Sequence, residues 1–193
     1  MAVFHRRQHL GKDYFMEHVL DVKKLVNELT LEEKASLCSG ADFWHTKAID
    51  RLNIPAAMVS DGPHGIRKQE SLADHMGVAE SIKAIGFPTA SAMACSFDRD
   101  LLHKVGDALG EECVAEDLAL LLGPGINMKR SPICGRNFEY YSEDPVVAGE
   151  LGAAFVNGVQ EHGVGTSLKH FAANNQEWRR MSISAAVSYT HLR

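Results

Sequence analysis

The chain alternates short apolar runs with longer segments of helical periodicity, and this alternation limits its possible folds more than any other feature. The apolar runs lie at residues 54–59, 87–90, 118–122 and 164–168. Each ends in glycine, proline or polar residues, as short buried strands do. Parallel strands need crossover connections, which are usually helices. The order β-α-β-α-β therefore predicts an α/β fold with a parallel sheet.

Local signals predict where the helices begin. Two helical patterns occupy residues 20–37, and the second begins with a capping-box sequence at Thr30. Asp98 precedes a helical pattern that reaches Val114, and Asp144 precedes Pro145, which suits the first turn of another helix. We expect each of these residues to cap a helix that covers the sheet.

Composition and charge exclude several classes of protein. The 193 residues include 25 acidic and 20 basic side chains, giving a net charge of −5, and no basic block could follow a phosphate backbone. No nucleic-acid partner is therefore expected. The run at 118–122 is far shorter than the roughly 18 residues of a membrane-spanning helix, so no membrane partner is expected either.

Cysteine and histidine spacing argues against a metal or a cofactor. The four cysteines are far apart and form no C-x-x-C pair, which favours reduced thiols and a cytoplasmic location. The ten histidines show no ligand spacing on one helix face. The sequence therefore predicts no metal site and no cofactor.

Polar residues follow the predicted strands at the edge where parallel α/β proteins build their sites. Asp61 comes after the first strand in a glycine-containing turn that also holds Arg67. A turn aspartate and a ligand for hydroxyl groups both remain open as interpretations of Asp61. Lys169 ends a buried strand, where its charge needs an acceptor or a substrate. His170, taken alone, is more typical of a core histidine.

Two arginines extend this set of candidates. Arg136 lies in a polar loop beside Gly135 and several aromatic residues, where a planar donor could be held over a sugar or a carboxylate. Arg180 follows the amide-rich segment 174–177, whose side chains suit hydroxyl groups.

Six strings occur in the order found in one enzyme family, over about residues 20–186. They are LTLEEK, DFWHT, SDGPHG, GRNFE, SEDP and KHF. With them the chain resembles the N-terminal barrel domain of glycoside hydrolase family 3, and in particular its bacterial β-glucosidases. The family's N-acetylglucosaminidase branch continues KHF with a Pro-Gly-His-Gly stretch, whereas this chain reads AANNQE. The resemblance is therefore to the β-glucosidase branch.

The resemblance implies a fold and an activity. The fold would be about the first half of a (β/α)8 TIM-type barrel, with parallel strands and crossover helices. The activity would be retaining hydrolysis of terminal non-reducing β-D-glucosyl residues from small-molecule or oligosaccharide β-glucosides. The residues matching the family's glucosyl-binding positions are Asp61, Arg67, Arg136, Lys169, His170 and Arg180.

The family's nucleophile and acid/base lie farther along its sequence than the part matched here. We therefore expect no catalytic residue within this chain and no activity from the chain alone. A monomer and a homo-oligomer both remain open for the complete protein.

The sequence also predicts the domain boundaries. Residues 1–18 are polar, rich in histidine and without a clean period, so we expect a loose extension in which Met1 and Met16 are both possible starts. The resemblance implies that residues 19–186 form the partial barrel domain. Residues 187–193 resemble a translated sequencing adapter and are expected to be non-native.

Two other functions stay open from the residues alone. A barrel lyase or aldolase could use Lys169 to form a Schiff base. A non-catalytic sugar-binding module could use the same polar residues without a nucleophile.

Overall fold

The computed structural model describes residues 21–69 and 80–184. The predicted extension at 1–18 and the predicted tail at 187–193 lie outside these residues. The chain divides into two compact units, Met1–Met58 and Val59–Arg193, which are described separately.

The first unit contains helices α3 (Val22–Glu28) and α4 (Leu31–Leu37) and the short 3-10 helix η1 (Asp50–Leu52). The predicted capping box at α4 is confirmed. Thr30 Oγ1 accepts from the backbone of Glu33, whose carboxylate accepts from the backbone of Thr30. Arg51 donates to the same carboxylate at 2.6 Å and to the carbonyl of Glu28 at 3.0 Å, which ties η1 to both helices.

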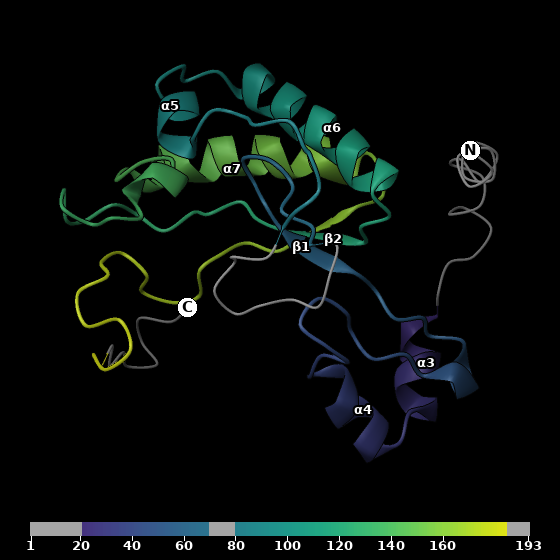
Figure 1. Ribbon diagram of the computed structural model, residues 1–193. Coiled ribbons are helices and arrows are strands. Elements are labelled where there is room, and N and C mark those ends of the chain that lie inside the picture. Colours follow the sequence, from purple (N-terminus) through teal and green to yellow (C-terminus); the bar gives the residue numbers. More distant parts are fainter. Residues whose placement is uncertain (1–20, 70–79, 185–193) are drawn as a thin grey trace. The chain divides into compact units, whose positions relative to one another are not determined.

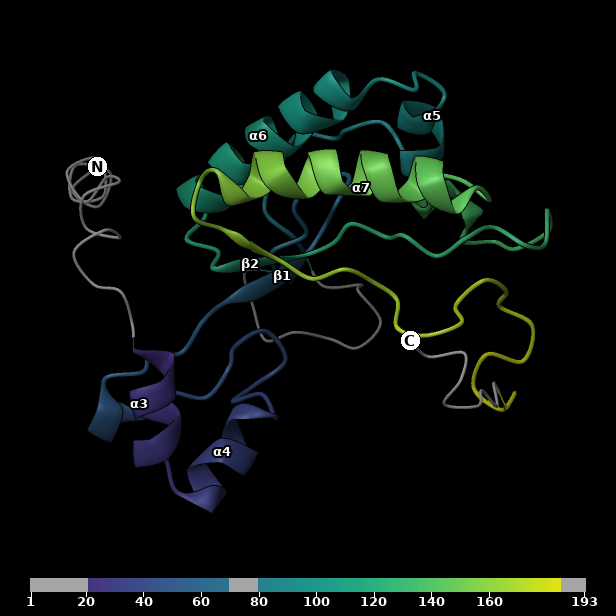
Figure 2. The same ribbon diagram turned by 180° about the vertical axis from the view of Figure 1, so that it is seen from behind.

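The second unit is built on a parallel sheet. Strands β1 (Val59–Asp61), β2 (Leu120–Leu122) and β3 (Gly165–Thr166) lie in the order β1-β2-β3. Helix α6 (Arg99–Ala115) connects β1 with β2, and α7 (Pro145–Gln160) connects β2 with β3. Figures 1 and 2 show both helices on the same side of the sheet. The predicted α/β fold with parallel strands and crossover helices, consistent with part of a barrel, is confirmed.

The predicted strand at 87–90 is wrong. Helix α5 (Ala90–Ala94) begins there, and Thr89 is its N-cap, with Oγ1 accepting from the backbone of Ala92. Phe87 and the β-branched Thr89 are typical of a strand, but a threonine hydroxyl also caps helices, and Pro88 has no N–H to donate to a neighbouring strand. The sheet in the described residues therefore has three strands. Strands β2 and β3 lie within the predicted runs, whereas β1 shares only Val59 with the run at 54–59 and extends to Asp61.

Close packing of α6 against α7 forms much of the core. A Cβ atom on Gly106 would lie 2.2 Å from the carbonyl oxygen of Phe155, and one on Gly158 would lie 2.2 Å from that of His103. Only glycine permits this backbone approach. Fully buried side chains around the contact are Leu102, Leu109, Phe155 and Val159. The predicted N-caps Asp98 and Asp144 are confirmed, since each accepts from two backbone N–H groups.

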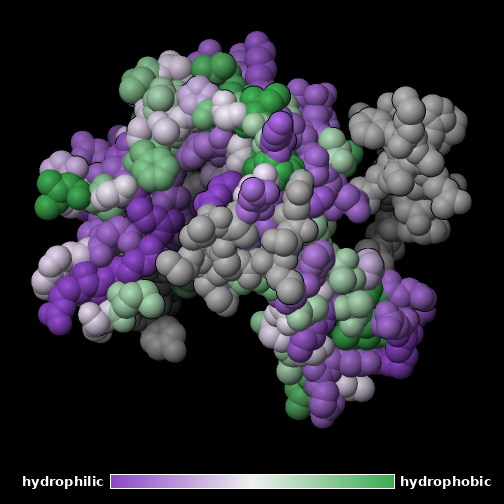
Figure 3. All heavy atoms as spheres, in the orientation of Figure 1, coloured by the Kyte–Doolittle hydropathy of each residue, from purple (hydrophilic) through white to green (hydrophobic). Residues whose placement is uncertain are grey.

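Several large apolar side chains nevertheless face the surface. On the face shown in Figure 3, hydrophobic residues are scattered among hydrophilic ones. The most exposed apolar side chains in the second unit are Phe97, Ile133, Phe171, Trp178 and Met181. Within the described residues, no helix has the length and apolar character needed to cross a membrane.

Candidate functional site

The site begins at the carboxyl ends of the parallel strands. Asp61 is the last residue of β1, whereas the sequence predicts that it directly follows the strand. Lys169 follows β3 and is fixed by its backbone, which donates to the carbonyl of Pro124 at 3.1 Å and accepts from the N–H of Ile126 at 2.8 Å. The segment after β2 therefore holds Lys169 level with the end of β1.

Asp61 and Lys169 form a close ion pair. Lys169 Nζ donates to Asp61 Oδ1 at 2.6 Å, and the lysine side chain is 16% exposed. Burial alone would raise the pKa of Asp61, but the hydrogen bond and positive charge of Lys169 outweigh it, and the pKa lies below its ordinary value. An ammonium has three donors, so this bond leaves two of the three for a ligand.

A glycine turn brings Arg67 to the same carboxylate. Gly62 and Gly65 have φ angles of 124° and 131°, and a Cβ atom on Gly62 would lie 2.1 Å from the carbonyl oxygen of Gly65. The backbone N–H of Arg67 donates to the carbonyl of Asp61 at 3.0 Å. Its guanidinium Nη1 lies 3.9 Å from Asp61 Oδ2 and remains largely open to solvent.

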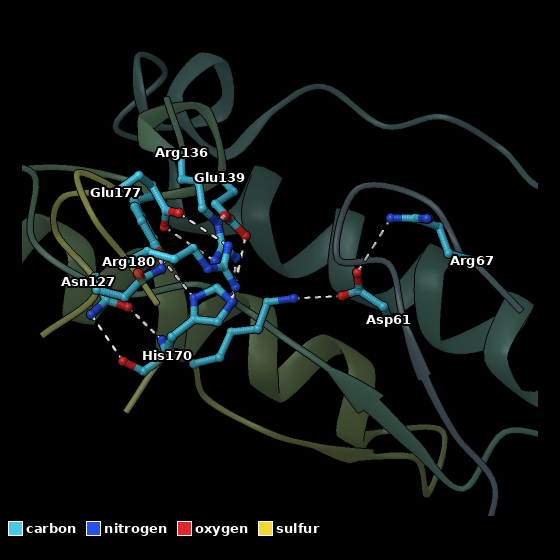
Figure 4. Close-up of polar contacts among 11 residues, drawn as sticks. Asp61, Arg67, Asn127, Arg136, Glu139, His170, Glu177 and Arg180 are labelled. Carbon is cyan, nitrogen blue, oxygen red and sulfur yellow. Dashed lines mark hydrogen bonds and ion pairs between the residues drawn. The ribbon is translucent and has the colours of Figure 1, made fainter. Parts of the chain in front are cut away.

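Arg136 is the centre of a second group of side chains (Figure 4). Its Nε donates to the buried carboxylate of Glu139, which the short helix η2 (Asn137–Glu139) turns back toward it. Its Nη2 lies 2.7 Å from His170 Nε2. Burial would lower the pKa of Arg136, but the hydrogen bond and charge of Glu139 outweigh this effect and raise it.

His170 joins the two groups, because it follows Lys169 in the chain and contacts Arg136. Its Nδ1 lies 2.8 Å from the Tyr140 hydroxyl. Asn127 holds its backbone from both sides, with Oδ1 accepting at 2.5 Å and Nδ2 donating at 3.1 Å. Burial and the positive charge of Arg136 lower the pKa of His170. The imidazole is therefore neutral near pH 7.

Arg180 reaches the site through Glu177. Arg180 Nη1 donates to Glu177 Oε2 at 3.1 Å, and Arg136 Nη1 lies 3.6 Å from Glu177 Oε1. All six predicted residues thus belong to two neighbouring groups. Asp61, Arg67 and Lys169 form one group, and Arg136, His170 and Arg180 form the other (Figure 4).

The sequence did not predict which residues orient these side chains. They are Asn127, Glu139, Tyr140 and Asn174, of which only Asn174 was among the residues expected to suit hydroxyl groups. Glu139 and Tyr140 lie in the same string as Arg136, and an i, i+3 spacing could have indicated the Arg136 to Glu139 pair. Asn127 and Asn174 act through contacts between distant segments, which no local pattern reveals.

A cavity of about 570 Å³ lies outside the predicted site. Among its lining residues are Ser91, Lys129, Asn137 and Tyr141. Lys129 Nζ donates to Ser91 Oγ at 2.7 Å, and burial lowers the pKa of the lysine. Within residues 21–69 and 80–184, no three His, Cys, Asp or Glu side chains gather as metal ligands would.

Fold and site together define an α/β protein with charged groups at the carboxyl ends of parallel strands, which is where barrel enzymes bind substrates. The family described as "Glycosyl hydrolase family 3 N terminal domain" matches residues 30–178. The chain belongs to this family.

Three known proteins illustrate the similarity. Thermostable beta-glucosidase B of Acetivibrio thermocellus is 58% identical over 174 residues, covering 90% of this chain and 23% of that protein. The exo-alpha-(1->6)-L-arabinopyranosidase of Bifidobacterium longum is 52% identical over 169 residues, covering 87% of this chain and 22% of that protein. The crystal structure of a beta-glucosidase from Kluyveromyces marxianus in complex with glucose is 44% identical, with a TM-score of 0.74, and covers 82% of this chain and 18% of that one. The chain thus spans about a quarter or less of each of these proteins.

Proposed function

We propose that this chain supplies the glucosyl-binding part of a β-glucosidase that hydrolyses terminal non-reducing β-D-glucosyl residues with retention of configuration. The observation that carries the proposal is the Lys169 to Asp61 ion pair beside the Arg136 and His170 network. Family membership and the two relatives named as beta-glucosidases support it. A β-glucoside is the proposed substrate.

The chemistry of the ion pair suits adjacent sugar hydroxyls. The ionised Asp61 accepts hydrogen bonds, while Lys169 retains donors that its bond to Asp61 does not use. A pair of neighbouring hydroxyls can donate to the first residue and accept from the second. Hydrogen bonds to charged groups are each worth about 1.5–3 kcal/mol, so the pair can orient a sugar firmly.

Retaining hydrolysis needs two further carboxyl groups, about 5–5.5 Å apart, as nucleophile and acid/base. The site's own carboxylates do not suit these roles. Asp61 is paired with Lys169, Glu139 with Arg136, and Glu177 with Arg180. We therefore place both catalytic carboxyl groups in sequence that follows the matched segment in the relatives, and we expect the chain alone to be inactive.

A relative of different specificity defines the second candidate. The Bifidobacterium longum protein, 52% identical, is named as an arabinopyranosidase. An α-L-arabinopyranoside is therefore the alternative substrate for the complete enzyme. The Schiff-base alternative is weaker, because Lys169 Nζ is hydrogen-bonded to the Asp61 carboxylate at 2.6 Å and, among the described residues, no apolar pocket surrounds it.

Release of nitrophenol from nitrophenyl glycosides tests the proposal. The chain alone should match a buffer blank. A chimera joining it to the residues that follow the matched segment in the Acetivibrio thermocellus relative should hydrolyse the β-glucoside, and Lys169→Met in that chimera should lower kcat/KM by at least about 100-fold. Faster hydrolysis of the α-L-arabinopyranoside would favour the second candidate. Turnover by the chain alone that is lost in Lys169→Met, or a chimera unaffected by that change, would contradict the proposal.

We also propose a cytoplasmic location. It is supported by the four cysteines, which are free thiols in the structure.

A further inference from the structure

We propose that Tyr140 is a positioning residue that fixes His170 in a single neutral tautomer and, through His170, sets the orientation of the Arg136 guanidinium. The inference deepens the proposed function, since it assigns Tyr140 a role in presenting Arg136 to the sugar. The geometry of the hydrogen bonds itself does not depend on that function.

The chemistry of Arg136 sets the direction of the first bond. A guanidinium only donates hydrogen bonds, so His170 Nε2, 2.7 Å from Arg136 Nη2, must accept. A neutral imidazole that accepts at Nε2 carries its proton on Nδ1. That proton points to the Tyr140 hydroxyl oxygen, which lies 2.8 Å from Nδ1 and therefore accepts.

The bond from His170 also fixes which group the Tyr140 hydroxyl donates to. Having accepted from His170, it donates its own proton to Asn174 Oδ1 at 2.6 Å. This orientation of the amide also lets Oδ1 accept from Arg136 Nη1 at 3.1 Å and lets Nδ2 donate to Glu177 Oε1 at 3.0 Å. The bonds thus form a closed ring that begins and ends at Arg136, and every donor in it meets an acceptor.

Tyr140 is held rigidly enough to impose this pattern. Its side chain is fully buried, and its ring meets the imidazole of His170 edge to face at 5.8 Å. Its backbone N–H donates to the carbonyl of Asn137, and its own carbonyl accepts from Ser91 Oγ. Turning the hydroxyl hydrogen toward Nδ1 would set two donors against each other, and removing the oxygen would leave the partly buried Nδ1–H without this acceptor.

The ring of hydrogen bonds also determines which nitrogens of His170 and Arg136 are engaged by protein groups. Both nitrogens of His170 contact protein groups, Nε2 with Arg136 and Nδ1 with Tyr140, so the imidazole can orient Arg136. Arg136 has five N–H donors, and its hydrogen bonds to Glu139, His170 and Asn174 engage three of them, while Glu177 Oε1 lies 3.6 Å from Nη1 as an ion-pair partner. Of the two N–H groups outside these hydrogen bonds, the one on Nη1 faces Glu177 and the one on Nη2 can donate to a hydroxyl.

Nitrogen-15 NMR of the histidine rings in the 193-residue chain tests the inference directly. Long-range proton–nitrogen correlations at pH 7.5 report which ring nitrogen carries the proton, and the His170→Gln variant assigns the signals. Wild type should show His170 as one neutral form with the proton on Nδ1 and slow exchange with water. In Tyr140→Phe this proton should exchange at least about 10-fold faster.

The matched control is Tyr141→Phe, which removes the hydroxyl of a neighbouring buried tyrosine that makes no contact with His170 in the described structure. It should leave the His170 signals unchanged. The signals of His103 and His162, which pair with carboxylates on the far helices, report whether each variant is folded. If Tyr140→Phe does not fold, Asn174→Ala takes its place and should speed the same exchange by a smaller factor.

A wild-type proton on Nε2, or a folded Tyr140→Phe variant with unchanged His170 signals, would overturn the inference. Binding of methyl β-D-glucopyranoside, measured separately, keeps the two proposals distinct. If wild type does not bind the sugar but His170 carries its proton on Nδ1, the proposed function alone is contradicted. Sugar binding without the fixed tautomer would contradict the role of Tyr140 alone.

Discussion

At the scale of single residues, the site depends on the protonation of a few partly buried groups. His170 must be neutral to accept from Arg136, and Asp61 must be ionised to bind Lys169. The pKa of each group is lowered in the folded chain, in His170 by burial and Arg136, and in Asp61 by Lys169 and Arg67 against the opposing effect of burial. Burial also lowers the pKa of His64, whose Nε2 accepts from the backbone of Ala90.

These shifts predict that acid destabilises the fold. A histidine whose folded pKa is depressed contributes stability above its unfolded pKa, about 6.5, and this contribution is lost as the pH falls toward the folded value. The midpoint of urea unfolding should therefore drop between pH 7.5 and 5.5. His170→Gln should show a smaller drop than wild type. An unchanged or higher midpoint at pH 5.5 would contradict this expectation.

At the scale of elements, the contact between α6 and α7 depends on glycines. Gly106→Ala would place a Cβ atom 2.2 Å from the Phe155 carbonyl oxygen, so the helices must move apart. We expect a loss of about 2–3 kcal/mol in the free energy of unfolding, measured with urea. Gly149→Ala in α7 is the matched control, because nothing lies within 4 Å of its Cβ position.

The control should raise stability by about 0.5–1 kcal/mol, since alanine favours the helix. Equal effects of the two substitutions would show that helix propensity, and not close packing, determines the result.

The elements also show what the sequence can predict. The N-caps at Thr30, Asp98 and Asp144 follow from side-chain chemistry within one helical turn, and all three are confirmed. The strand expected at 87–90 is wrong because Thr89 suits both a strand and an N-cap, and the packing of α5 decides between them. Asp61 and Lys169 were predictable from their places at strand ends. The roles of Tyr140 and Asn174 were not, because they arise only when segments 30 or more residues apart meet.

At the scale of the whole molecule, the sheet of the second unit has open edges. In the described residues β1 and β3 each pair on one side only, whereas a closed barrel pairs every strand on both sides. Unpaired edges and exposed apolar side chains favour association between chains. Ile133, Phe171 and Met181 are each at least 90% exposed.

We therefore predict that the isolated chain self-associates. Its average mass in sedimentation velocity should rise with concentration over the micromolar range. Replacing Ile133, Phe171 and Met181 together with serine should reduce this association, whereas three substitutions of exposed lysines should not. A strictly monomeric chain at all concentrations would contradict the prediction.

The account as a whole is tested most directly by the affinity of the chain for methyl β-D-glucopyranoside, measured by saturation-transfer NMR. Wild type should bind the sugar, and Lys169→Met should bind at least about 10-fold more weakly, which corresponds to about 1.4 kcal/mol for a lost charged hydrogen bond. Lys104→Met removes an exposed lysine of α6 and should bind like wild type. Absence of binding in the folded wild-type chain, or equal binding by a folded Lys169→Met variant, would contradict the account.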